Sequence, residues 1–145
     1  MRRSDPMVLV AVLGGLLTGC LSAGGTGTGA ATPEEAVRRY VAAADAKDVD
    51  GLAAVWGTAQ APLADRASRP EMERRSFIVF CHLQHDAVEL TGPALGEGGR
   101  QLFRVALRQG ERSATTTFAT VQNARSKRWF VETFDLTAVV ALCTH

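Results

Sequence analysis

The pattern of apolar residues changes character near His85, and this change limits the fold more than any other feature of the chain. Before it, apolar residues recur at the three- and four-residue spacing of helices. After it, they alternate with polar residues, as they do in strands with one buried face. Helices followed by a series of strands predict an α+β domain, in which N-terminal helices pack on a curved antiparallel β-sheet.

The first helix has a well-marked start. Thr32 suits the N-cap, Pro33 suits the first helical position, and Glu35 completes a capping box. A shorter second helix is expected to begin after Asp48 and to end near Gly57, because aspartate is a good N-cap and glycine a common residue just past a helix end. Both helices carry apolar residues on one face.

A loop is expected over residues 60–69, and a third helix from there to about residue 83. The four-residue run at 77–80 also suits a strand, but the charged residues before it favour a helix. The apolar stripe of this helix is expected to contain Met72, Ser76, Val79 and Leu83, widened by Phe77, Phe80 and Cys81.

Four strands are expected after the helices, because apolar residues alternate and β-branched residues are frequent there. Their predicted ranges are 85–91, 101–109, 112–122 and 127–135, with a Gly/Pro-rich loop over 92–99. The apolar segment 136–143 either extends the last strand or packs back as a turn of helix.

Three segments resemble the NTF2-like (cystatin-like) superfamily: the Pro-Glu-Glu start of the first helix, Ala-Lys-Asp-Val-Asp-Gly-Leu at 46–52, and Lys-Arg-Trp-Phe-Val at 127–131. The resemblance covers about residues 33–136. It implies a sheet wrapped on a long helix, forming a cone with an apolar pocket. Members of this superfamily often dimerise through the outer face of the sheet, so a homodimer is one expectation.

The start of the chain carries a separate signal. Arg2 and Arg3 precede an apolar run over 7–17, which is shorter than the about 20 residues that a spanning helix needs. The run ends in Leu17-Thr18-Gly19-Cys20, which resembles the lipobox of bacterial lipoproteins. The resemblance implies cleavage before Cys20 and a lipid on its thiol. The alternative is an ordinary secretory signal peptide that contains a cysteine.

This signal predicts the domain organisation and the location. Residues 1–19 are expected to be a signal peptide, 20–32 the lipidated cysteine with a flexible Gly-rich tether, and 33–145 the folded domain. The protein would be anchored on the extracytoplasmic side of a membrane. Leu21, in place of an aspartate, resembles lipoproteins that are sorted to the outer membrane, where the domain would face the periplasm.

Charge excludes one class of partner. Removing residues 1–19 takes two arginines and one aspartate from the 16 basic and 15 acidic residues, which leaves the mature chain formally neutral. A neutral chain has no electrostatic basis for binding nucleic acid. Attachment to the membrane is therefore expected to come from the lipid rather than from a basic patch.

Two cysteines remain besides Cys20. In an oxidising compartment, Cys81 and Cys143 are expected to form a disulfide. The alternative is a zinc site in which these two cysteines join His85 and His145. The disulfide is the stronger expectation, so no metal is predicted.

The sequence contains no P-loop, nucleophile elbow, zinc-protease helix or Cys-x-x-Cys motif, and no cofactor is predicted. The leading hypothesis is a non-catalytic domain that binds a small apolar ligand or a protein partner. Candidate pocket residues are Tyr40, Trp56, Phe103 and Trp129, each of which could instead pack in the core.

Two other functions stay open. An NTF2-like enzyme of the isomerase or dehydratase type would use His85 and Asp86, which form the best acid–base pair in the chain. A structural envelope protein would dimerise through its sheet and would need no ligand.

Overall fold

The computed structural model describes residues 27–144, so Cys20 with the segment that resembles a lipobox, and the C-terminal His145, lie outside the described residues. Within this range, three α-helices precede four β-strands, and three short 3-10 helices connect or follow them. The α-helices are α1 (Pro33–Asp45), α2 (Val49–Val55) and α3 (Arg69–Leu83). The strands are β1 (Ala87–Leu95), β2 (Gln101–Gln109), β3 (Arg112–Gln122) and β4 (Trp129–Phe134). The 3-10 helices are η1 (Leu63–Asp65), η2 (Glu97–Gly99) and η3 (Thr137–Cys143).

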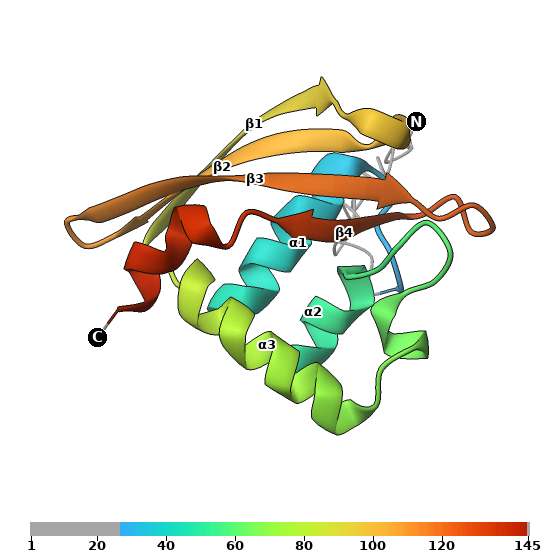
Figure 1. Ribbon diagram of the computed structural model, residues 1–145, viewed down its shortest axis with the longest axis horizontal. Coiled ribbons are helices and arrows are strands. Elements are labelled where there is room, and N and C mark those ends of the chain that lie inside the picture. The colour runs from blue at the N-terminus through green and yellow to red at the C-terminus, as the bar shows by residue number, and fades with distance from the viewer. Residues whose placement is uncertain (1–26, 145) are drawn as a thin grey trace, which may run out of the picture.

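The strands form one open sheet in the order β1-β2-β3-β4, and every neighbouring pair is antiparallel. All three α-helices lie on the same face of this curved sheet (Figure 1). The prediction of an α+β domain with N-terminal helices packed on a curved antiparallel sheet is confirmed. The last apolar segment forms η3 rather than an extension of β4, so the second of the two alternatives for residues 136–143 is the correct one.

The core lies between α1 and the concave face of the sheet. Phe103, Val105 and Leu107 on β2 are buried, whereas Arg104 and Arg108 between them are exposed on the outer face. The inward side chains meet an aromatic cluster around Tyr40 of α1. Its ring lies 5.6 Å from that of Trp56, 5.7 Å from that of Phe118 and 6.2 Å from that of Phe134.

The helix starts follow the sequence closely. The Glu35 amide donates to Thr32 Oγ1 at 3.1 Å, and the Gly51 amide donates to the Asp48 carboxylate at 2.9 Å. These bonds satisfy amides that have no partner inside the helix. At α3, in contrast, Ser68 precedes the helix but provides no side-chain hydrogen bond to its start.

Two other expectations need correction. Phe77 does not widen the buried stripe of α3, because 76% of it is exposed. The Gly/Pro-rich segment after Thr91 is not wholly a loop, because β1 continues to Leu95 after a shift in its pairing with β2. The shift lets the strand pass Gly92 and Pro93, which cannot keep a regular ladder.

The Gly-rich segment before α1 is bound to the domain from Gly27 onwards, although it was expected to be a free tether up to Thr32. Ala30 is fully buried and forms a bridge with Trp129 of β4. The Arg39 guanidinium donates to the carbonyl oxygens of Gly27 and Gly29, at 2.8 and 2.9 Å. The segment makes these contacts through its backbone groups, so it can be bound to the domain although it has no large side chains.

Within residues 27–144, no helix is long and apolar enough to cross a membrane.

Candidate functional site

An apolar cleft opens where α3 faces β4, and we call it the α3–β4 cleft. Its volume is about 350 Å³, which falls within the range of small-molecule pockets. Its walls are formed by side chains of α1, α3 and β4, and by residues of the segments that follow α2 and β4. The lining residues are Tyr40, Trp56, Arg75, Ile78, Val79, Glu132, Thr133, Phe134 and Leu136.

Trp56 is the central residue of this region. It follows the last residue of α2 and has an extended backbone, so its chain leaves the helix and runs beside β4. There it forms a parallel bridge with Val131, and the next amide, of Gly57, donates to the Val131 carbonyl at 3.0 Å. The end of a short helix is therefore fixed against the sheet, which places the half-buried indole at the cleft.

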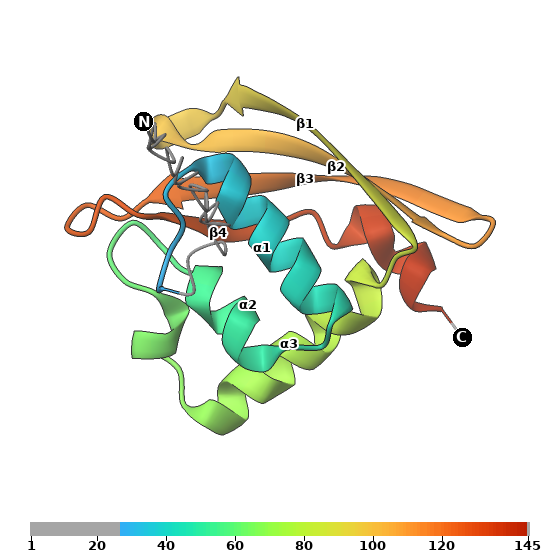
Figure 2. The same ribbon diagram turned by 180° about the vertical axis from the view of Figure 1, so that it is seen from behind.

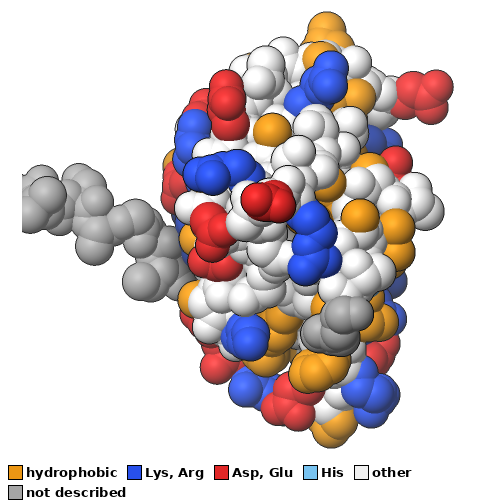
Figure 3. Space-filling model, turned by 90° about the vertical axis from the view of Figure 1, so that its left-hand side faces the viewer, with side chains coloured by type: hydrophobic (Ala, Val, Ile, Leu, Met, Phe, Trp, Pro, Cys, Tyr) orange, Lys and Arg blue, Asp and Glu red, His pale blue; other side chains and the backbone are white. Residues whose placement is uncertain are grey.

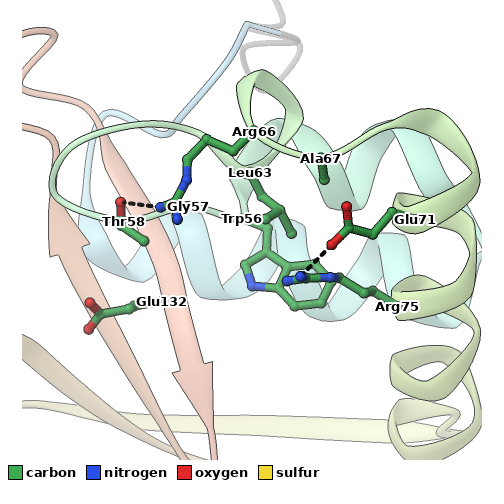
Figure 4. A pocket seen from close by; sticks show the side chains of 9 residues that line it. All are labelled: Trp56, Gly57, Thr58, Leu63, Arg66, Ala67, Glu71, Arg75 and Glu132. Atoms are coloured by element: carbon green, nitrogen blue, oxygen red, sulfur yellow. Dashed lines mark hydrogen bonds and ion pairs between the residues drawn. The ribbon is translucent and has the colours of Figure 1, made fainter.

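A second hollow, of about 210 Å³, lies on the other side of Trp56 and shares Arg75 and Glu132 with the cleft. In Figure 4, Leu63 and Arg75 extend toward the Trp56 indole from the segment after α2 and from α3. Its remaining lining is more polar and includes Thr58, which accepts a hydrogen bond from Arg66 at 3.4 Å. The two hollows therefore differ in chemistry, and the α3–β4 cleft is the apolar one.

The charged side chains at the rim are paired. Arg75 donates to the Glu71 carboxylate at 2.5 Å, one turn away on α3. Glu132 accepts a bond of 2.9 Å from Arg100, and this hydrogen bond raises the pKa of the Arg100 guanidinium. Since both charges at the cleft have partners, the site offers no unpaired charge that would select a strongly ionic ligand.

Tyr40 forms the inner end of the cleft. Its ring is fully buried, and burial raises the pKa of its hydroxyl well above 10. The Tyr40 hydroxyl therefore stays neutral at physiological pH. In this form it can donate or accept a hydrogen bond.

The four predicted pocket residues separate into two pairs. Tyr40 and Trp56 line the α3–β4 cleft. Phe103 is buried in the core, and Trp129 is half-buried beside the segment before α1, where its backbone pairs with Ala30. Packing between sheet and helices, and not pocket lining, accounts for this second pair.

His85 and Asp86 are held in contacts that support the fold. His85 Nδ1 lies 2.8 Å from the Leu83 carbonyl and 3.7 Å from Asp45 Oδ1, on a side chain that is 10% exposed. Asp86 is exposed just before β1, where it accepts a hydrogen bond of 2.6 Å from the Gly110 amide in the β2–β3 turn. Neither residue lines the α3–β4 cleft or the hollow beside it.

Cys81 and Cys143 lie at disulfide distance, with their Cα atoms 5.0 Å apart and their sulfur atoms bonded to each other. The bond joins α3 to η3, which brings the C-terminal segment back onto the helices. Within the described range, no group of three or more His, Cys, Asp or Glu side chains is arranged to hold a metal ion. His145, the fourth member of the alternative zinc site, lies outside that range.

Several cleft residues were not singled out from the sequence. Ile78 was assigned only to the third helix, in a run that also suited a strand, and Glu132 to the last strand. Leu136 was assigned to the segment that could extend that strand or form a turn of helix. The sequence shows which helix or strand each of these residues belongs to. It does not show that α3 packs beside β4, because this depends on tertiary packing. The one available signal was Ile78 itself, an apolar residue that lies outside the predicted buried stripe.

The cleft opens onto a larger apolar surface over α3 and η3. Large exposed apolar side chains here are Phe77, Ile78, Leu136 and Val140. Figure 3, which views the end of the molecule that carries η3, shows hydrophobic side chains grouped on its lower part. Exposed apolar side chains that lie near one another are more common at binding sites than elsewhere on a protein surface.

Comparison with protein-family models, curated proteins and solved structures finds no match to this chain.

Proposed function

We propose that this protein is a lipid-anchored, non-catalytic binding domain of the NTF2-like type, and that the α3–β4 cleft holds a small apolar ligand. The observation that carries the proposal is the lining of the cleft. Aromatic rings of Tyr40, Trp56 and Phe134 and aliphatic chains of Ile78 and Val79 surround a volume of about 350 Å³. The proposed lipid on Cys20 would hold this domain on the extracytoplasmic face of a membrane, with the outer membrane as the expected site.

The balance of interactions favours an apolar ligand. Burial of apolar surface contributes about 25 cal/mol for each Å² removed from water, so aromatic and aliphatic walls favour a ligand of the same kind. Tyr40 and Thr133 add neutral polar groups to the lining residues. The paired charges of Arg75 and Glu132 remain at the rim, where they stay in contact with water.

An enzyme that uses His85 and Asp86 receives less support. A general acid or base must reach the reacting atoms, within hydrogen-bond distance or through one water molecule. The His85 ring instead contacts the Leu83 carbonyl, and the Asp86 carboxylate accepts a hydrogen bond from the β2–β3 turn, away from the cleft.

A structural dimer formed through the sheet also receives less support. Stable homodimer interfaces are more apolar than the average protein surface. The outer face of the sheet instead carries mostly polar or small side chains. Its residues include Glu89, Thr91, Arg104, Arg108, Ser113, Thr115 and Thr117.

The test is binding of a neutral naphthylamine dye to the mature chain with Cys20→Ser, which carries no lipid and needs no detergent. Binding is followed by energy transfer from tryptophan to the dye. We expect saturable binding of one dye, weakened about tenfold or more by Ile78→Glu, because a carboxylate in the cleft must lose water when the dye binds.

Val140→Glu is the matched control. Ile78 and Val140 are both about half exposed, at 53% and 55%, on the same apolar surface, but Val140 does not line the cleft. This variant should bind the dye as the parent does. Equal loss of binding in both variants, or no saturable binding in the parent, would contradict the proposal.

A further inference from the structure

Basic residues gather in the turn between β3 and β4. Arg125 and Lys127 are exposed there, and Arg128 is partly buried. Within the part of the chain that the structure describes, none of these three forms an ion pair with an acidic side chain. The formal neutrality of the mature chain therefore conceals a local excess of positive charge at one end of the sheet.

The segment that leads to Cys20 meets the domain at this same end. Arg128 Nη2 donates to the Gly29 carbonyl at 2.9 Å, across 99 positions of sequence. The neighbouring Ala30 exchanges two backbone hydrogen bonds of 2.9 Å with Trp129. Figures 1 and 2 show the start of the described chain beside β4, close to the β3–β4 turn in both views.

Few residues separate the described domain from Cys20. Because the chain is bonded to the domain from Gly27, only the residues between Cys20 and Gly27 separate a lipid on Cys20 from the domain. These seven peptide units reach at most about 25 Å when fully extended. A lipid on Cys20 would therefore keep the domain close to the membrane surface.

From these observations we infer that the β3–β4 turn faces the membrane, and that Arg125 and Lys127 bind the headgroups of anionic phospholipids. This inference rests on the proposed lipid anchor. The lipid anchor attaches the protein to the membrane, and the charged turn orients the domain. Basic residues close to an anionic leaflet are attracted to that leaflet, so the β3–β4 end turns toward the membrane. The opposite end, with the β2–β3 turn, then points away from the membrane.

The chain contains its own reporters for this orientation, because its only lysines are Lys47 and Lys127. Both are exposed. Lys127 lies at the β3–β4 turn, whereas Lys47 lines a surface pocket with Gln109 and Arg112 at the β2–β3 turn. The two lysines thus mark opposite ends of β3, whose eleven residues span about 35 Å.

The experiment measures the rate at which a water-soluble amine reagent modifies each lysine. The lipidated full chain is purified from membranes and inserted into vesicles of phosphatidylcholine, with or without about one third phosphatidylglycerol, and mass spectrometry separates the two sites. In anionic vesicles we expect Lys127 to react about threefold to tenfold more slowly relative to Lys47, and about 0.5 M NaCl to remove the difference. Equal ratios in both vesicle types would overturn the inference.

Two charge reversals sharpen the result. Arg125→Glu should remove most of the protection of Lys127, because it replaces one of the positive charges of the turn. Arg104→Glu, at an exposed position on the outer face of β2, makes the same change in net charge and should leave the protection unchanged. Loss of protection in both variants would show that total charge is responsible and would overturn the role of the turn.

Flotation of the vesicles separates failure of the orientation from failure of the anchor. A chain that floats with neutral vesicles but shows equal lysine ratios contradicts the orientation alone. A chain that does not float with neutral vesicles contradicts the lipid anchor and the orientation with it. Protection of Lys127 by inorganic phosphate without vesicles would assign the turn to a soluble anion and contradict the membrane role.

Discussion

Ala30 and Trp129 form a reciprocal pair in which each amide donates to the other's carbonyl at 2.9 Å. The pair covers part of the free edge of β4, where Trp56 and Val131 form a second bridge. An uncovered edge strand presents unpaired backbone groups to other chains. The segment before α1 is therefore part of the domain from Gly27 onwards, and it lies against the end of the sheet.

Gly29→Ala should weaken this connection. Gly29 has φ +74°, and a Cβ there would lie 2.6 Å from the Arg128 Cβ and 2.8 Å from the Phe130 ring. We expect the free energy of unfolding to fall by about 1–3 kcal/mol, as backbone strain and close contact combine. Denaturant unfolding measures the change.

Gly27→Ala is the matched control for this variant. A Cβ at Gly27 would have no atom within 4 Å, so the substitution should leave stability unchanged within about 0.5 kcal/mol. Equal effects at the two glycines would show that the segment before α1 is not held against β4 as described.

The fold was largely predictable because its local signals agree with one another. Thr32 and Pro33 mark the start of α1, and the alternation of Phe103, Val105 and Leu107 marks the buried face of β2. The tether was less predictable. Backbone pairing holds Ala30 in place, and a Gly-rich sequence gives no sign of a partner that lies about a hundred residues away.

The candidate site could be predicted only in part. Tyr40 and Trp56 were available as large aromatic residues, but so was Phe103, which is in the core. Helical and strand periods show which residues share a face of one element. The cleft, in contrast, depends on how far α3 stands from β4, and this distance follows from the packing of the whole domain.

Ser76→Ala should leave the protein as stable as the parent or more stable. Within the described residues, the Ser76 hydroxyl is buried on α3 without a hydrogen-bond partner. Burial of an unsatisfied polar group costs about 1–3 kcal/mol, so its removal is favourable if the site tolerates the lost atom. Thermal unfolding tests the direction.

Thr120→Val provides the contrast. Thr120 is also fully buried, but its hydroxyl donates to the Gln101 carbonyl at 2.9 Å. Its loss leaves that carbonyl without this bond and should lower stability by about 1 kcal/mol or more. A drop of the same size for Ser76→Ala would mean that the Ser76 hydroxyl has a partner in solution.

Tyr40 predicts a loss of stability at alkaline pH. Burial raises the pKa of its hydroxyl well above 10 in the folded state. Below pH 10 both states keep the proton and the group adds no pH dependence. Above it, the unfolded chain releases the proton before the folded chain does, so stability falls as the pH rises, by up to about 1.4 kcal/mol per unit.

Since Tyr40 is the only tyrosine in the chain, its ionisation can be followed by absorbance at alkaline pH. We expect the tyrosinate signal to rise together with loss of structure, and Tyr40→Phe to remove this part of the alkaline slope. A tyrosinate signal near pH 10 in a protein that remains folded would contradict the burial of the ring.

The pair Cys81 and Cys143 predicts a large effect of reduction. The residues are 62 positions apart, and closing a loop of this length stabilises by about 4 kcal/mol in the chain-entropy model. Reduction should therefore lower the melting temperature of the parent to that of Cys81→Ser/Cys143→Ser. The double variant should not respond to the reductant, and a parent that also does not respond would contain no disulfide.

The lipid on Cys20 is the central claim, because the location, the short tether and the orientation of the domain all depend on it. The most direct test is the intact mass of the full chain after expression in a bacterium and extraction from its membranes. The account predicts the mass of residues 20–145, less two hydrogens for the disulfide, plus the mass of a diacylglyceryl group with or without a further acyl chain. A mass equal to the unprocessed chain, or to a cleaved chain without lipid, would contradict it.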